Sequence, residues 1–288
     1  MKPFLVFLLC VFSICCFRAI EPVQVVTPEE PPEPEQFCSP IEGPTEIRTD
    51  GHVSLENVSF SYVPNWIEKV EYSVIPECVL IRNDYKPDPI GGRTLQFNLH
   101  YSASEEEATI LIFKIADYKN AFAKYPQFVE NRDAELLAII NGGSRLKRYG
   151  LEPPPHVTWM DAGQSFYSRA KKIDFIGGHG IFTVTDISND TLITVANSNL
   201  LFLFQGFTTD GIYFVEMNIP AKLNGFPEEA DEFPNGSNKP NYDSREHLKA
   251  WQKYLLKTAA RIDKASSSDF QPNAAWVEKF IRGFQIKS

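Results

Sequence analysis

The residue types that most often carry out chemistry are few in this sequence, and their spacing matches no common catalytic or metal-binding pattern. No two of the five histidines lie four residues apart, the spacing that places two metal ligands on one face of a helix. The five cysteines form no CxxC pair, and no serine lies in a GxSxG motif. We therefore expect no metal centre, no bound cofactor and no catalytic site of a common type.

Two histidines have neighbours that could build a site from distant parts of the chain. His179 lies in the segment GGHG, where a glycine turn could present it as a general base or a metal ligand. His156 follows three prolines and precedes Asp161, so these two side chains could line a cleft. Together the three residues indicate an extracellular hydrolase as one hypothesis. The simpler interpretation places each histidine on the surface without a role.

A regular series of basic residues lies near the end of the chain. Arg245, Lys249, Lys253, Lys257 and Arg261 recur at every fourth position. Because each four-residue step advances about 40° beyond a full helical turn, they would form a broad basic band on a helix. Such a band is a candidate docking face for an anionic membrane surface or an acidic partner. The alternative is a solvated outer face.

The overall charge argues against one class of partner. The chain has 28 lysines and arginines against 37 aspartates and glutamates, which gives a formal charge of −9. Since a chain of this charge repels phosphates, we expect no binding to nucleic acid. Hydrophobic residues make up 43% of the sequence, an ordinary globular value that excludes a fully disordered chain.

The first residues are typical of a secretory signal. Lys2 is followed by about 14 apolar residues, within the usual length of such a segment and short of the roughly 20 that cross a bilayer. We expect a leader over 1–19, an extended spacer rich in proline and glutamate over 20–37, and one folded domain over 38–288. The alternative for the first segment is a core helix or strand. The location that follows is extracytoplasmic: secreted, periplasmic or membrane-anchored.

The cysteines fall into two groups. Cys15 and Cys16 close the apolar run, where a cysteine can become a lipidated N-terminus, although the preceding residues lack the small side chain that such processing prefers. Cys38 and Cys78 are the cysteines of the expected domain. Two cysteines in an exported domain predict one disulfide, and two free thiols are the alternative.

Periodic patterns predict the elements of the domain. Apolar residues alternate over 94–101, and an apolar stretch over 108–115 completes a β-hairpin. Helical patterns follow from Asp117 and again over 131–143. Residues 168–219 contain four apolar strands separated by turns, among them Asp210-Gly211, and predict a four-stranded meander.

A long amphipathic helix is expected from Asp243 onward. Its apolar stripe should lie on the open face of the sheet and consists of Leu248, Trp251, Leu255, Ala259 and Ile262. A short helix and a possible edge strand close the chain. These elements predict an α+β fold: an antiparallel sheet of a hairpin, a helix and a meander, with the long C-terminal helix packed on one face.

One stretch also resembles a known group of proteins. Residues 196–220 are similar to an uncharacterised family of bacterial exported, lipoprotein-like α+β domains, whose signature is an aromatic strand ending in FQG, a turn containing DG, and a second aromatic strand ending in proline. The matching residues are Phe202, Phe204, Gln205, Gly206, Asp210, Gly211, Tyr213 and Pro220. The resemblance implies architecture and export, and no activity.

The functional expectation that follows is an exported or envelope-attached binding or accessory module without catalysis. Its partner would be an unknown envelope or extracellular protein or ligand. The alternatives are the hydrolase assembled from distant residues and a structural component of a surface complex.

Overall fold

The computed structural model describes residues 51–63, 66–75, 92–101, 107–123, 131–143, 146–158, 162–188, 192–233 and 245–287, and the backbone of 45–47. All of them belong to one unit that runs from Pro34 to Ser288. The predicted leader, Cys15, Cys16, Cys38, Cys78 and Asp161 lie outside the described residues. No helix in the described part of the chain is long and apolar enough to cross a bilayer.

The unit is built on an eight-stranded sheet in which every neighbouring pair of strands is antiparallel. In spatial order the strands are β1 (Thr45–Ile47), β4 (Ile67–Ile75), β5 (Thr94–Tyr101), β6 (Glu107–Lys114), β10 (Tyr213–Pro220), β9 (Leu200–Thr208), β8 (Gly178–Asp186) and β7 (Tyr167–Phe175). The β5–β6 hairpin and the β7–β10 meander confirm the sequence prediction. The pairing of β6 with β10 joins them, with Ile110 opposite Met217.

Side-chain alternation gives this sheet two different faces. On the first face Phe97, Ile110 and Met217 are fully buried in one large apolar cluster. On the second face the neighbouring positions hold polar residues over much of the area, with Asn98 and Glu216 as examples. The period of two along each strand produces this difference.

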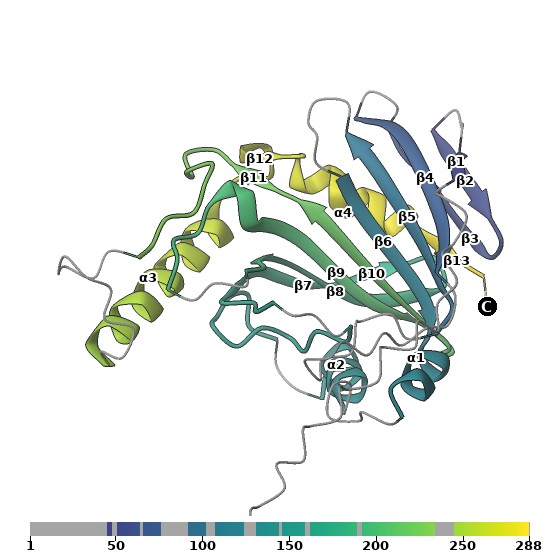
Figure 1. Cartoon of the computed structure of the whole chain (residues 1–288), viewed down its shortest axis with the longest axis horizontal. Helices are drawn as coiled ribbons and strands as arrows, with labels where there is room; N and C mark the ends of the chain where they lie inside the picture. Colours follow the sequence, from purple (N-terminus) through teal and green to yellow (C-terminus); the bar gives the residue numbers. More distant parts are fainter. Residues whose placement is uncertain are drawn as a thin grey trace, which may run out of the picture. The chain divides into compact units, whose positions relative to one another are not determined.

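The first face is covered by two helices and a small sheet. Helix α3 (Arg245–Lys264) and helix α4 (Ala274–Gly283) pack on it, together with β2 (His52–Leu55), β3 (Val58–Ser61) and β13 (Gln285–Ile286). Figure 1 shows α4 lying across the strands. A short pair of strands, β11 (Lys222–Leu223) and β12 (Phe270–Gln271), links the segments that precede these two helices. Each large side chain that these layers bury contributes about 1.5–3 kcal/mol.

The predicted stripe of the long helix is correct except at its first member. Leu255, Ala259 and Ile262 are buried against the sheet. Leu248 is 41% exposed, because in the first turns His247 faces the protein instead and its ring lies 5.5 Å from that of Phe233. The helix therefore packs first on a loop and only later on the sheet.

Two short helices cover one end of the second face. Helix α1 (Ile115–Ala121) and helix α2 (Arg132–Ile140) build a second apolar cluster with the strands. Its buried members are Phe113, Tyr118, Phe122, Leu136, Ile140, Val157, Ile181, Phe207 and Phe214. Val157 belongs to a segment without regular secondary structure that crosses this face, and the same segment lines a hollow of the surface. The short 3₁₀ helices η2 (Asn197–Asn199) and η3 (Ser267–Asp269) complete the described elements.

Candidate functional site

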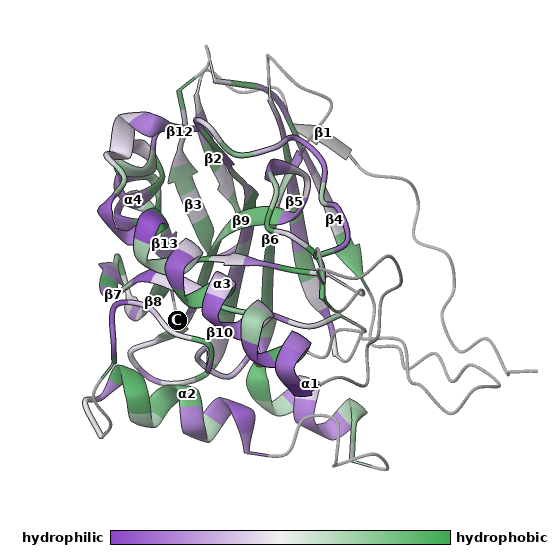
Figure 2. Cartoon of the chain, turned by 90° about the vertical axis from the view of Figure 1, so that its left-hand side faces the viewer, coloured by the Kyte–Doolittle hydropathy of each residue, from purple (hydrophilic) through white to green (hydrophobic). Residues whose placement is uncertain are grey.

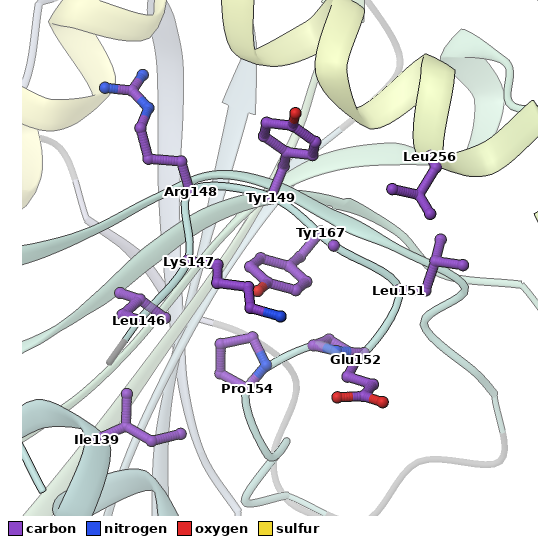
Figure 3. Close-up of a pocket in the computed structure, with 12 residues that line it drawn as sticks. Ile139, Leu146, Lys147, Arg148, Tyr149, Leu151, Glu152, Pro154, Tyr167 and Leu256 are labelled. Atoms are coloured by element: carbon purple, nitrogen blue, oxygen red, sulfur yellow. The ribbon is translucent and has the colours of Figure 1, made fainter. Parts of the chain in front are cut away.

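A groove of about 620 Å³ lies between α2, α3 and the beginning of β7. Figure 3 shows the side chains that line it. They are Ile139, Leu146, Lys147, Arg148, Tyr149, Leu151, Glu152, Pro153, Pro154, Tyr167 and Leu256, and Gly150 completes the wall. Most of this lining is aliphatic or aromatic, and its volume is within the range of small-molecule sites. We call it the Tyr167 groove.

Segment 146–154 forms one wall of the groove because it pairs with the edge strand β7. The amide of Gly150 donates to the carbonyl of Tyr167 at 3.0 Å, and the amide of Tyr167 donates back at 2.9 Å. The amide of Ala170 donates to the carbonyl of Arg148 at 2.8 Å. These bonds cover the start of an otherwise open sheet edge and fix the wall beside Tyr167.

Glycine is required at position 150 by the closeness of this contact. A Cβ atom there would lie 2.9 Å from Cε1 of Tyr167 and 3.1 Å from its hydroxyl oxygen. The tyrosine ring therefore lies directly against the backbone of the wall. The contact with the backbone at Gly150 fixes the orientation of the Tyr167 ring in the groove.

The charged side chains of the groove differ in their freedom to meet a ligand. Arg148 is held by Asp263, with Nε and Nη2 each 3.0 Å from Oδ1. Within the described part of the chain the ammonium group of Lys147 forms no ion pair, and Figure 3 shows Lys147 extending toward the centre while Arg148 points away. Burial, with a smaller effect of Glu152, raises the pKa of the Tyr167 hydroxyl, which therefore stays a neutral donor.

The same wall is fastened to the second face of the sheet by a buried glutamine. Gln205 on β9 accepts from the amide of Val157 at 2.9 Å and donates to the carbonyl of Pro155 at 3.2 Å. One side chain thus satisfies both a donor and an acceptor of a segment that has no regular structure. This role of Gln205 is not among the expectations from the sequence, although a lone amide in the apolar strand LLFLFQGF is a usable signal for it.

A buried polar cluster fastens the end of the wall. Thr158 donates from its hydroxyl to Oε2 of Glu216 at 2.7 Å, and Asn218 donates to Oε1 at 2.7 Å. Nδ1 of His156 lies 2.8 Å from the carbonyl oxygen of Thr158, and Nε2 lies 3.5 Å from Oε2 of Glu216. His156 is 8% exposed and Glu216 is 2% exposed. The cluster is closed to solvent, so its geometry suits attachment of the wall better than catalysis.

The structure corrects both histidine interpretations. His156 is buried against Glu216, so it neither lies on the surface nor lines the groove. His179 lies within strand β8 opposite Asp174, because the turn falls earlier, at Ile176 and Gly177. His179 is two strands away from Glu216, and no hydrogen bond or ion pair between described residues joins it to His156. Asp161 lies outside the described residues.

The predicted basic residues occupy a different part of the surface. Lys249, Lys253 and Lys257 are exposed on α3, and none of them lines the Tyr167 groove. Lys257 borders a second hollow of about 550 Å³ together with Arg261 and Lys264. Among the described residues no group of three or more histidine, cysteine, aspartate or glutamate side chains is placed to hold a metal ion.

Comparison with known proteins identifies no relative that has this groove. No protein-family model, no curated protein and no solved structure matches the chain. The resemblance to exported bacterial domains therefore stays a prediction. The chemistry of the groove is what bears on function.

Proposed function

We propose that this chain is an exported, non-catalytic binding module whose ligand lies in the Tyr167 groove. The observation that supports this most is the groove itself, which combines an apolar and aromatic lining with a lysine free of ion pairs within the described residues. Of the groove's described lining residues, none is histidine, cysteine, serine or aspartate. The predominantly apolar lining favours recognition of a ligand.

The lining also indicates the class of ligand. Tyr149 and Leu256 are 37% and 43% exposed and offer apolar surface to a flat or extended group. Lys147 supplies a positive charge, and the hydroxyl of Tyr167 supplies a neutral donor. We infer an amphipathic ligand: an aromatic or alkyl body that carries a carboxylate or a similar anion.

The export part of the proposal comes from the sequence. The apolar first segment and the spacer that follows it are typical of a translocated protein, and they lie outside the described residues. The hydrolase alternative has less support, since His156 is closed to solvent and His179 lies two strands away from Glu216. A role as a structural component of a surface complex stays open as the second hypothesis.

A matched pair of ligands tests the proposed recognition. Isothermal titration would compare 2-naphthoate with its neutral analogue 2-naphthylmethanol. We expect the anion to bind roughly two- to fivefold more tightly, because one partly exposed charge contact contributes up to about 1 kcal/mol. Lys147→Gln should remove this preference and leave binding of the neutral analogue unchanged.

The control for that comparison is Lys279→Gln, which removes an exposed lysine from α4, outside the groove. It should bind both ligands like the parent protein. Failure of either ligand to bind at millimolar concentration, or an anion preference that survives in Lys147→Gln, would contradict the proposal.

A further inference from the structure

Helix α3 concentrates positive charge in a protein that is acidic as a whole. Its 20 residues include six basic and two acidic side chains, whereas the chain carries a formal charge of −9. One of the two acidic residues, Asp263, is already paired with Arg148. The basic residues are Arg245, Lys249, Lys253, Lys257, Arg261 and Lys264, and all six are exposed. We call them the basic face of α3.

The packing of the helix turns this face away from the protein. Leu255, Ala259 and Ile262 are buried on the opposite side of α3. Within the described residues, Lys249 and Lys253 form no ion pair. Figure 1 shows α3 at one flank with no other described helix or strand outside it, and Figure 2, which looks onto this flank, shows the helix as mostly hydrophilic.

One exposed leucine borders this hydrophilic surface. Leu256 is 43% exposed and stands three residues after Lys253 and seven after Lys249, so it shares their side of the helix, whereas Leu248 shares the side of the buried Leu255. Leucines beside lysines are the combination by which a helix rests on an anionic bilayer, with the apolar groups in the boundary region and the ammonium groups among the head groups.

From this arrangement we propose that the basic face of α3 docks on an anionic bilayer surface. An acidic protein fits less well, because stable protein interfaces bury about 800 Å² on each side around an apolar, aromatic core in which lysine is depleted. The basic face offers lysines and one leucine in place of such a core. Head groups need no fixed partner geometry, so flexible lysines suit them. The acidic remainder of the domain would be repelled, which orients the molecule with α3 toward the membrane.

The docking face shares Leu256 with the Tyr167 groove, but docking requires no ligand in the groove, and a vesicle assay tests it. The full-length protein would be sedimented with vesicles of phosphatidylcholine alone and with vesicles containing about one third phosphatidylglycerol. The apolar first segment is the same in every variant, so the quantity compared is the gain in binding caused by phosphatidylglycerol. We expect Lys249→Gln, Lys253→Gln and Lys257→Gln together to reduce this gain roughly 100-fold, since each lysine near an anionic surface contributes about fivefold.

A matched triple variant shows whether the loss of binding comes from removing lysines of α3 or only from removing three positive charges from the protein. Lys172→Gln, Lys279→Gln and Lys287→Gln remove three exposed lysines outside α3 and should keep the gain. Far-ultraviolet circular dichroism would show that each variant is folded.

Three results would overturn the proposal. The first is equal binding of the parent protein to both vesicle types, and the second is an equal loss in the two triple variants. The third is a parent protein that ignores the vesicles but binds polyglutamate through the basic face, which would assign the face to an acidic protein. Whatever the vesicle assay shows, titration with 2-naphthoate tests the ligand site in the groove as a separate measurement.

Discussion

Nε2 of His156 lies 3.5 Å from Oε2 of Glu216, and both side chains are buried where the segment that forms the wall of the Tyr167 groove ends. Glu216 also accepts hydrogen bonds from Thr158 and Asn218. The wall, residues 146–154, and the residues that follow it to Thr158 form no helix and no strand of the sheet. The position of the wall therefore depends on this cluster, on Gln205 and on the pairing of Gly150 with Tyr167.

Removal of the Glu216 carboxylate should destabilise the protein strongly. Glu216→Ala leaves the buried hydroxyl of Thr158 and the half-buried amide of Asn218 without an acceptor, and we expect a loss of about 3 kcal/mol in the free energy of unfolding. Glu216→Gln keeps one acceptor and should lose about half as much. Urea unfolding measures both, with Glu229→Gln as an exposed control. Equal stability of Glu216→Ala and the control would show that the cluster does not hold the wall.

The neutral imidazole of His156 should adopt the Nδ1–H tautomer. Its Nδ1 faces the carbonyl oxygen of Thr158 at 2.8 Å, and a carbonyl oxygen only accepts, so the proton must be on Nδ1. The hydroxyl oxygen of the same threonine, 3.0 Å from Nδ1, is a second acceptor. Long-range ¹H–¹⁵N NMR of the histidine rings measures this directly. A neutral His156 with its proton on Nε2 would contradict the assigned geometry.

Gly150→Ala should damage the groove more than the fold. The new Cβ would lie 2.9 Å from Cε1 of Tyr167, so the ring or the wall must move. We expect roughly tenfold weaker binding of 2-naphthoate and a loss of about 1–3 kcal/mol in stability. Gly283→Ala is the matched control, because a Cβ at that position meets no atom within 4 Å. Unchanged affinity in Gly150→Ala would mean that the ligand does not contact this wall.

The buried carboxyl of Asp186 should make stability depend on pH. Burial raises its pKa above the ordinary value, and the hydrogen bonds from Ser165 offset this only in part. Because the folded-state pKa is the higher one, the stabilising contribution is full below the unfolded pKa of about 3.9 and is lost as the pH rises through the folded value. The stability of Asp186→Asn relative to the parent protein should therefore increase from about pH 4 upward and then level off. A relative stability that falls over this range would contradict the direction of the shift.

The sequence predicts the framework of this protein better than its site. Leu95, Phe97 and Leu99 alternate with polar residues, and Leu255, Ala259 and Ile262 recur at helical spacing, so both patterns specify which side is buried. They depend only on local periodicity. The fold class follows from the order of such elements along the chain.

The groove could not be predicted in this way. Its lining comes from α2, an irregular segment, the edge of β7 and α3, which pairing and packing alone bring together. The polar residues that fasten its wall, Gln205 and Glu216, lie in largely apolar strands, and their partners in the wall segment lie about 50 residues away. The misplacement of His179 has a local cause, since the turn uses Gly177 and leaves the next two residues in the strand.

The most direct test of the central claim is to locate 2-naphthoate on the protein by intermolecular nuclear Overhauser effects. The proposal predicts contacts from the naphthalene protons to the ring of Tyr167 and to the methyl groups of Leu256, and their loss in Gly150→Ala. Contacts to residues elsewhere, or none at a ligand concentration that saturates binding, would contradict the assignment of the Tyr167 groove as a ligand site.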